Sequence, residues 1–357
     1  MNPRTALIYI SILALAGFVV AAIAAPAVAR LLIRFKCWKK SVRSVAPDGS
    51  ATPLFAALHK DKETKTPRGA GILMWGSVFV VAILARLVAQ SFPHTPLVHL
   101  DFINRSQTWI PLAILGFMSV LGLLDDILVV GGFGIIEKGG GIKFRHRMLA
   151  VLVAAGVAAY WFHYKLGWDM IHIPLVGNMF VGWWYIPLFI FVLVGLNSAS
   201  VVDGIDGLAG GVFAILYATF AAIAFARGQF FLSAFCAVYA GSITAFLWYN
   251  VSPAIFYMGE TGILGLTTTL GVVAFFTNTV LLLPLAGIIL VWEALSVAIQ
   301  LTSKKFLHRK IFLIAPYHHH LEAKGWPAHK VTMRFWIVTG IACLATLVIA
   351  LVDIIWK

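Results

Sequence analysis

The chain has 357 residues, of which 61% are hydrophobic and 11% charged, and it carries a formal net charge of +13. A water-soluble domain of this size has about 25% charged residues, so the composition excludes one. The three cysteines are scattered and form no Cys-x-x-Cys pair, which excludes a disulfide framework or a cysteine zinc site. We therefore predict a single integral membrane domain that spans residues 1–357.

Ten apolar runs are long enough to cross a bilayer, which takes roughly 20 apolar residues in a helix. Each run is continuous rather than alternating, so helices are favoured over β-strands as the spanning form. The expected fold class is an all-α polytopic membrane protein. In chain order the ten runs cover residues 6–33, 69–90, 109–128, 148–164, 184–200, 208–226, 230–248, 262–277, 279–301 and 334–356.

The basic residues are distributed unevenly between the loops. Loops 34–68, 129–147 and 302–334 together hold twenty Lys and Arg, whereas the opposite side holds six. Basic loops are retained in the cytoplasm, so both termini are predicted to be extracytoplasmic, in agreement with an even number of spans. Much of the positive charge is then a topology signal, and we expect no nucleic-acid partner.

Residues 171–184 predict a small external β-hairpin. Gly177-Asn178 lies between two apolar runs, a pattern typical of hairpin connections. Trp183 and Trp184 leave open another interpretation, an aromatic belt at the membrane surface.

The ninth run contains two residues that are unusual in a membrane helix. Pro284 should kink or break the helix, because proline removes a backbone hydrogen bond. Glu293 carries a carboxylate that is costly to bury in a membrane and normally faces the protein interior. We expect Glu293 to have a structural partner on another helix, with a direct catalytic part as the alternative.

Five acidic residues recur at the predicted cytoplasmic ends of spans. Such residues do not help to retain basic loops on that side, so they either pair with Lys or Arg or hold a cation. Adjacent carboxylates on a helix point about 100° apart, so one can bind an ion or act as a base while the other orients a partner. Solvated end charges and an Asp N-cap are alternative interpretations. The five are Asp125, Asp126, Asp203, Asp206 and Glu260.

Further polar and basic residues fall on the same predicted side. An aromatic face can stack on a nucleobase, and basic side chains ahead of a helix start suit a phosphate group. Three consecutive histidines indicate a metal site, a proton relay or a phosphate-contacting cluster. These candidates are Lys65, Arg68, Asn197, Tyr257, His318, His319 and His320.

Carboxylates, histidines, basic side chains and glycine-containing loops on one membrane side favour phosphoryl transfer. Carboxylates hold Mg²⁺, the metal bridges phosphate oxygens, and basic groups neutralise developing charge. An acceptor delivered from the lipid would explain why the enzyme is a membrane protein. An ion- or proton-coupled transporter is the alternative from another class, but such proteins place ionisable groups near the bilayer midplane.

Over most of its length the chain resembles the phospho-N-acetylmuramoyl-pentapeptide-transferase family, one branch of the polyprenyl-phosphate N-acetylhexosamine-1-phosphate transferases. The most specific part is residues 293–336, which contain the histidine triplet followed by Gly-Trp and Arg-Phe-Trp. The Asp-Asp pair at 125–126 and the Asp-Gly-Ile-Asp-Gly-Leu-Ala motif at 203–209 agree with the wider superfamily. Ten spans with both ends outside also fit that family.

The resemblance implies a reaction, a cofactor and a location. UDP-N-acetylmuramoyl-pentapeptide and undecaprenyl phosphate would give lipid I and UMP, the first membrane step of peptidoglycan synthesis, with Mg²⁺ as cofactor. The protein would be a homodimer in the bacterial cytoplasmic (inner) membrane, with its active site on the cytoplasmic face.

The resemblance also implies roles for individual residues. Asp125 would deprotonate or position the lipid phosphate, with Asp126 in support. Glu260 would ligate the metal, and Asp203 would lie in the catalytic cleft beside it. The remaining implied contacts are to uracil from Asp206 and Tyr257, and to phosphates or sugar from Lys65, Arg68, Asn197, His318, His319 and His320, with His318 essential.

Several positions depart from the family pattern, among them Ser200 in place of an expected Asn and Ile263 where Ser is common. Arg68 stands where the family usually has Thr. An Arg at this position resembles the pattern of the N-acetylglucosamine-1-phosphate branch. Transfer of another N-acetylhexosamine-1-phosphate is therefore the alternative function. Glu260 replaces the usual Asp and is one methylene longer. For the chemical step we favour direct attack by the lipid phosphate over a covalent intermediate on a carboxylate.

Overall fold

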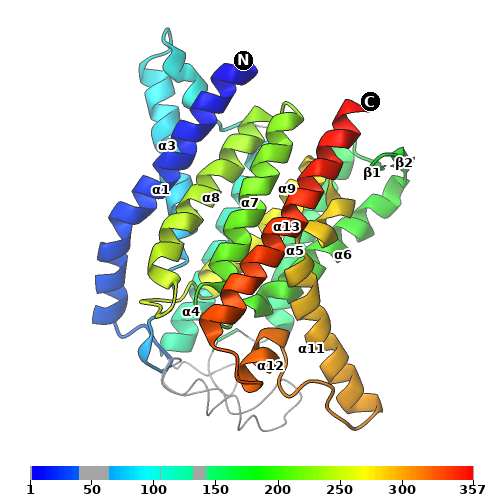
Figure 1. Ribbon diagram of the computed structural model, residues 1–357. Coiled ribbons are helices and arrows are strands. Elements are labelled where there is room, and N and C mark those ends of the chain that lie inside the picture. The colour runs from blue at the N-terminus through cyan, green and yellow to red at the C-terminus, as the bar shows by residue number, and fades with distance from the viewer. Residues whose placement is uncertain (1, 40–63, 105, 132–140, 143, 357) are drawn as a thin grey trace.

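The computed structural model describes residues 2–39, 64–104, 106–131, 141–142 and 144–356. Within these residues the protein is a bundle of helices with one two-stranded sheet (Figure 1). The helices are α1 (Pro3–Arg34), α3 (Ile72–Ser91), α4 (Trp109–Gly131), α5 (Phe144–Tyr160), α6 (Tyr185–Ser198), α7 (Leu208–Ala226), α8 (Phe230–Asn250), α9 (Glu260–Phe276), α10 (Leu283–Ala286), α11 (Ile288–Phe306), α12 (Tyr317–Ala323) and α13 (Ala328–Ile355). The shorter elements are η1 (Pro96–Leu100), η2 (Trp161–Lys165), β1 (Met170–Ile173), β2 (Gly177–Phe180), η3 (Gly182–Trp184), η4 (Ala199–Val202) and η5 (Val280–Leu282).

The predicted polytopic all-α class is confirmed. In the described part of the chain eight helical segments are long and apolar enough to cross a membrane, and the bent pair formed by 280–286 and 288–306 makes a ninth. The eighth predicted run, 262–277, corresponds to α9, an apolar helix of 17 residues.

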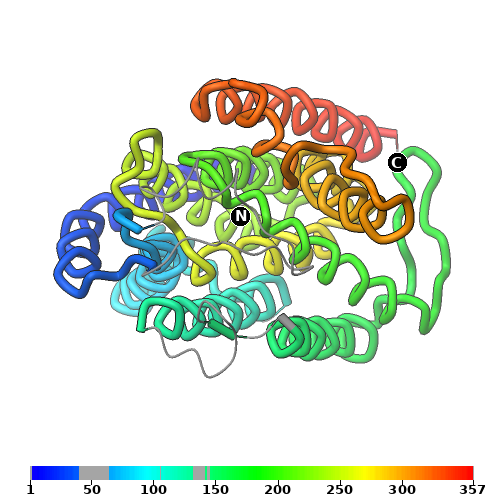
Figure 2. Tube along the Cα trace, turned by 90° about the horizontal axis from the view of Figure 1, so that it is seen from below, coloured from blue at the N-terminus to red at the C-terminus, as the bar shows by residue number. Residues whose placement is uncertain are grey.

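Helix α9 lies at the centre of the bundle. Every residue from Thr261 to Phe276 is buried, and a helix that is apolar on all sides belongs in a protein core. Figure 2 shows α9, in yellow, running between the other helices. On α4, a Cβ at Gly122 would overlap the backbone of Glu260 and Thr261, so glycine is what allows the end of α4 to approach the start of α9.

The chain ends and the histidine-bearing helix lie at opposite ends of the bundle. Both termini are at the top of Figure 1, and α12 is at the bottom. This arrangement agrees with an even number of crossings. Which end faces the cytoplasm stays a prediction from the distribution of basic residues.

The predicted β-hairpin is confirmed, but its turn is displaced. Strand β1 pairs antiparallel with β2, from Met170 opposite Phe180 to Ile173 opposite Gly177. The connection is therefore residues 174–176, with Leu175 at φ 65°, and the Gly-Asn pair opens the second strand. The alternative interpretation, an aromatic belt, also agrees with the structure. The rings of Trp183 and Trp184 are exposed and stack with their centroids 4.7 Å apart.

The ninth span is broken, as predicted. Segments 280–286 and 288–306 meet at an angle of 79°. Pro284 lies in the first turn of α10, where its missing N–H costs little, and the bend falls three residues later at Gly287. The break directs α11 towards α12.

Candidate active site

The junction of α4 and α9 holds the first two candidate carboxylates. Asp126 accepts the backbone N–H of Thr261 at 3.0 Å and, through its other oxygen, the Nε–H of Arg68 at 2.9 Å. The first turn of a helix has unpaired N–H groups that favour an anionic acceptor. Gly259, which precedes α9 at φ 71°, supplies no side-chain cap, and a Cβ there would overlap the Asp126 carboxylate. Asp126 therefore caps α9 from a different helix.

Asp125 is one residue earlier on α4 and faces another way. Its carboxylate accepts the backbone N–H of Ile142. A Cβ at Gly141 would lie 3.0 Å from the Asp125 carboxylate, so the 141–142 backbone is held tightly against it. The two adjacent carboxylates thus have separate partners, which is the divergence expected from their spacing.

Glu260 begins α9 and is bound on one side only. Its Oε1 accepts from Arg147 on α5 at 2.8 Å. Its Oε2 is buried and has no hydrogen-bond partner among the described residues. A buried carboxylate oxygen without a partner is costly, so this atom is available to an external ligand. Arg147 was not identified from the sequence, where its only signal is its place in a basic loop at the end of a span.

Asp203 lies in the turn between η4 and α7, close enough to the α4–α9 junction to share its electrostatics. Burial raises the pKa of Asp203 to about 7, Arg68 opposes this shift, and Glu260 and Asp126 add to it. For Arg68, burial lowers the pKa while four carboxylates raise it, and the net direction is upward. The carboxylates and the guanidinium therefore form one cluster from segments far apart in the chain.

The charges of this cluster do not cancel. Four carboxylates face two guanidinium groups, so the acidic groups outnumber the basic ones by two, although the Asp203 carboxyl, with a pKa of about 7, is only partly ionised at neutral pH. The free Oε2 of Glu260 is a hard oxygen donor of the kind that Mg²⁺ prefers. No group of three or more His, Cys, Asp or Glu in the described residues is already arranged around a metal position. The excess of carboxylates and the free Glu260 oxygen would suit a magnesium ion, with Glu260 as one of the residues that would hold it.

His318 on α12 lies next to the cluster. Its backbone N–H and its Nδ1 both meet the Glu293 carboxylate, at 3.1 and 2.8 Å, and both side chains are 0% exposed. The interhelical partner predicted for Glu293 is confirmed. A Cβ at Gly204 would overlap His318 Nε2, so the ring packs against the residue that follows Asp203.

The rings of His318 and His319 lie with their centroids 4.1 Å apart and their Nε2 atoms both near Gly204, but the Nδ1 atoms of the three histidines have different partners. His319 Nδ1 lies 2.7 Å from Glu322. His320 Nδ1 accepts the backbone N–H of Leu313 at 3.1 Å, and burial, together with Lys324, lowers the pKa of His320. Each ring therefore has a partner of its own, as does His318. Glu322 was not identified from the sequence, although its position three residues after His319 on a short helix was the available signal.

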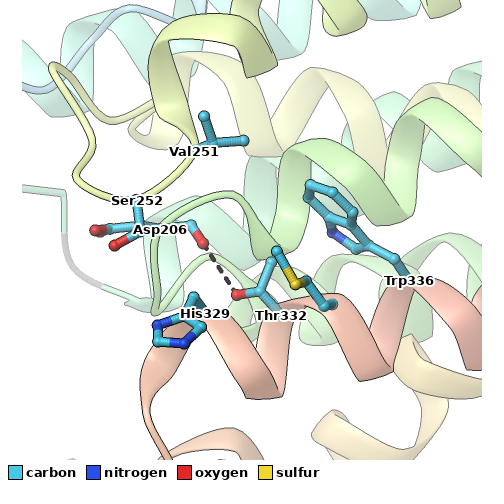
Figure 3. A pocket seen from close by; sticks show the side chains of 7 residues that line it. Asp206, Val251, Ser252, His329, Thr332 and Trp336 are labelled. Carbon is cyan, nitrogen blue, oxygen red and sulfur yellow. Dashed lines mark hydrogen bonds between the residues drawn. The ribbon is translucent and has the colours of Figure 1, made fainter.

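Asp206 and Tyr257 meet at the other end of the Asp203–Asp206 turn. Tyr257 Oη donates to the Asp206 carboxylate at 3.3 Å, and the N–H of Ala254 donates to its other oxygen at 3.4 Å. Burial and the adjacent carboxylate raise the pKa of Tyr257. Figure 3 shows the cavity beside Asp206, and its lining is Asp206, Val251, Ser252, His329, Thr332, Met333 and Trp336.

Lys65 and Arg68 are brought to this region by pairing between two loops. The backbone of 67–71 is joined to that of 257–258 by three hydrogen bonds, among them Tyr257 N–H to Pro67 at 2.7 Å. Lys65 is exposed, whereas Arg68 points at Asp126. Asn197 near the end of α6 is 1% exposed, and neither of its polar side-chain atoms has a partner in the described part of the chain.

Comparison with known proteins agrees with this arrangement. Residues 108–278, which run from the start of α4 to the end of α9, match the family described as Glycosyl transferase family 4. The phospho-N-acetylmuramoyl-pentapeptide-transferase of Chloroflexus aurantiacus is 33% identical over 332 residues, which cover 90% of this chain and 84% of the relative. The proteins of the same name from Clostridium novyi and Levilactobacillus brevis are 32% and 30% identical, over 92% and 93% of this chain and 93% and 95% of theirs.

The helical bundle, its acidic cluster and these matches define a multi-pass membrane phosphoglycosyl transferase. The chain belongs to the phospho-N-acetylmuramoyl-pentapeptide-transferase family.

Proposed function

We propose that the protein transfers phospho-N-acetylmuramoyl-pentapeptide from UDP-N-acetylmuramoyl-pentapeptide to undecaprenyl phosphate and releases lipid I and UMP. The observation that carries this proposal is the gathering of Asp125, Asp126, Asp203 and Glu260 at one end of the bundle, around Arg68. The name of the relatives supports the identity of the transferred group. The reaction is the first membrane step of peptidoglycan synthesis.

In this reaction an oxygen of the lipid phosphate forms a bond to the β-phosphorus of the nucleotide. The bond from that phosphorus to the bridging oxygen breaks, and UMP leaves with the bridging oxygen. Enzymes accelerate such transfers mainly by positioning the two phosphates and by neutralising charge. Asp125, held by the Ile142 N–H, would receive the proton of the lipid phosphate or orient its attacking oxygen.

Mg²⁺ is the cofactor in this proposal, and Glu260 and Asp203 would hold it. When bound, the ion would neutralise charge on the diphosphate. The free Glu260 Oε2 supports this assignment, because a buried carboxylate oxygen with no partner among the described residues is left to an external ligand. Asp126 would contribute by capping α9 and thereby fixing the position of Glu260.

The nucleotide would bind beside the Asp203–Asp206 turn. Tyr257 offers an aromatic face and Asp206 a carboxylate for the uracil edge. The orphaned amide of Asn197 and the exposed Lys65 would contact sugar and phosphate, together with the histidines of α12. Because Arg68 is already paired with Asp126, we place it as a charge-balancing residue near the phosphates rather than as a free phosphate ligand.

The membrane location completes the proposal. We place the protein in the bacterial cytoplasmic membrane as a homodimer, with α12 and the acidic cluster on the cytoplasmic face. The separation of both termini from α12 along the bundle supports this orientation (Figure 1), since the segment 302–334, which contains α12, is rich in Lys and Arg.

The test is UMP release by purified protein supplied with both substrates and Mg²⁺. We expect UMP and a radiolabelled lipid product that moves with lipid I on thin-layer chromatography. No UMP from properly folded protein would contradict the proposal. A competition between the muramoyl-pentapeptide nucleotide and UDP-N-acetylglucosamine decides the donor, and preference for the second would favour the alternative that Arg68 raised.

A further inference from the structure

We propose that Glu293 is a positioning residue, which fixes the orientation and tautomer of His318 so that Nε2 of that ring faces the sugar-phosphate. The inference rests on the proposed function and adds a residue to its site. Glu293 lies on α11, and it acts through the histidine.

The contact between the two side chains is specific in its geometry. One Glu293 oxygen accepts the backbone N–H of His318 at 3.1 Å, and the other lies 2.8 Å from Nδ1 of the ring. An ionised carboxylate only accepts hydrogen bonds, so Nδ1 must carry the hydrogen. The two bonds to one residue hold the ring at both its backbone and its edge. The other ring nitrogen, Nε2, then carries no hydrogen and faces away from Glu293.

The surroundings of Nε2 indicate where that nitrogen acts. It is buried and has no hydrogen-bond partner in the part of the chain that the structure describes. The nearest backbone is that of Gly204, where a Cβ would overlap the nitrogen, and Asp203 is close enough for its charge to interact with His318. A buried nitrogen without a partner, next to the acidic cluster, is placed to meet a substrate group.

The break in the ninth span explains how the carboxylate reaches the ring. The chain bends by 79° at Gly287, and Glu293 follows in the second turn of α11. Both side chains are 0% exposed, so no water competes for the carboxylate. Fixing a histidine by a buried carboxylate on Nδ1 is an established way to select the ring nitrogen that acts on substrate.

Glu293→Gln tests the role with almost no change in shape. The amide has one acceptor, and if that atom keeps the His318 N–H, the amide N–H₂ faces Nδ1 and moves the ring hydrogen to Nε2. We expect kcat to fall about 10- to 100-fold with little change in KM. Ser296→Ala is the matched control, because Ser296 is 0% exposed on the same helix and donates only to the carbonyl of Glu293. Its kcat should stay within about twofold of the wild type.

A double variant separates positioning from general stability. In protein that already carries His318→Ala, adding Glu293→Gln should not lower kcat further, because the ring that the carboxylate orients is gone. A multiplicative loss in the double variant would overturn the proposal. Glu293→Asp keeps the charge and should restore part of the activity that Glu293→Gln loses.

The tautomer itself is measured by ¹⁵N NMR of histidine-labelled protein in detergent, with His318→Ala to assign the signal. We expect Nδ1 to be the protonated nitrogen in the wild type. If the ring hydrogen were on Nε2 instead, Nδ1 would accept a hydrogen bond from a protonated Glu293. That result would overturn the proposal, even if Glu293→Gln failed to fold. If the wild type released no UMP, the proposed function would fall, whereas the NMR result would still decide the Glu293–His318 geometry.

Discussion

Asp126 on α4 caps a helix far along the chain by accepting the N–H of Thr261, 135 residues later, at 3.0 Å. The same carboxylate neutralises Arg68, so one side chain links α4, the segment before α3 and the start of α9. Glu260 is the first residue of α9, and the cap therefore sets the position of the proposed metal ligand. Stability and activity are coupled at this side chain.

Asp126→Ala should lower the free energy of unfolding by about 1–3 kcal/mol, because a buried N–H and a guanidinium lose their acceptor. Turnover should fall with it, since the start of α9 is no longer held. Thermal unfolding in detergent measures the first effect. Asp126→Asn is the control, because its amide oxygen can still accept the Thr261 N–H, and it should be destabilised less. Equal unfolding temperatures for wild type and Asp126→Ala would contradict the capping role.

Asp125→Asn should separate chemistry from folding. The amide oxygen can keep the hydrogen bond from Ile142, so the unfolding temperature should change little. The loss of a proton acceptor should lower kcat by about 100-fold or more. UMP release under saturating substrates gives kcat, and a near-normal rate would mean that Asp125 does not handle the lipid phosphate.

Glu260 variants test the proposed metal site. Glu260→Gln removes one of the charges that attract the ion, so half-maximal activity should need a higher Mg²⁺ concentration. Glu260→Asp restores the residue usual in the family and should retain activity, although the shorter side chain reaches less far towards Arg147. Titrating Mg²⁺ after removal with a chelator gives the comparison. An unchanged Mg²⁺ requirement in Glu260→Gln would assign the ion elsewhere.

Gly204→Ala should abolish turnover, because the added methyl group would occupy the space of His318 Nε2. Gly195→Ala on α6 is the matched control, since a Cβ there meets nothing within 4 Å and alanine is the better helix former. The steady-state rates of the two variants provide the test. Similar rates would show that His318 can move away without loss.

Several features of the fold and site follow from local patterns in the sequence. Continuous apolar runs predict the spans, and the spacing of Asp125 and Asp126 predicts that their side chains diverge. The break in the ninth span was predicted from Pro284, but the bend itself falls at Gly287. A carboxylate at position 293 inside a membrane helix requires a partner, and that requirement is visible before the partner is known.

Other features depend on contacts between distant segments. The pairing of Glu260 with Arg147 and the cap from Asp126 to Thr261 join helices that no local pattern connects. In the hairpin, too, local composition did not predict the position of the turn. Gly177-Asn178 has the composition of a turn, yet Leu175 takes the left-handed backbone position and the Gly-Asn pair enters a strand, where Asn178 bonds His172 at 2.7 Å.

The location of the two chain ends has a practical use. Both emerge at the end of the bundle remote from α12 (Figure 1). An affinity handle or a fluorescent fusion joined to either end is separated from the acidic cluster by the length of the spanning helices. Immobilising the protein by such a handle should therefore leave the α12 end, where we propose that the nucleotide binds, open to solvent.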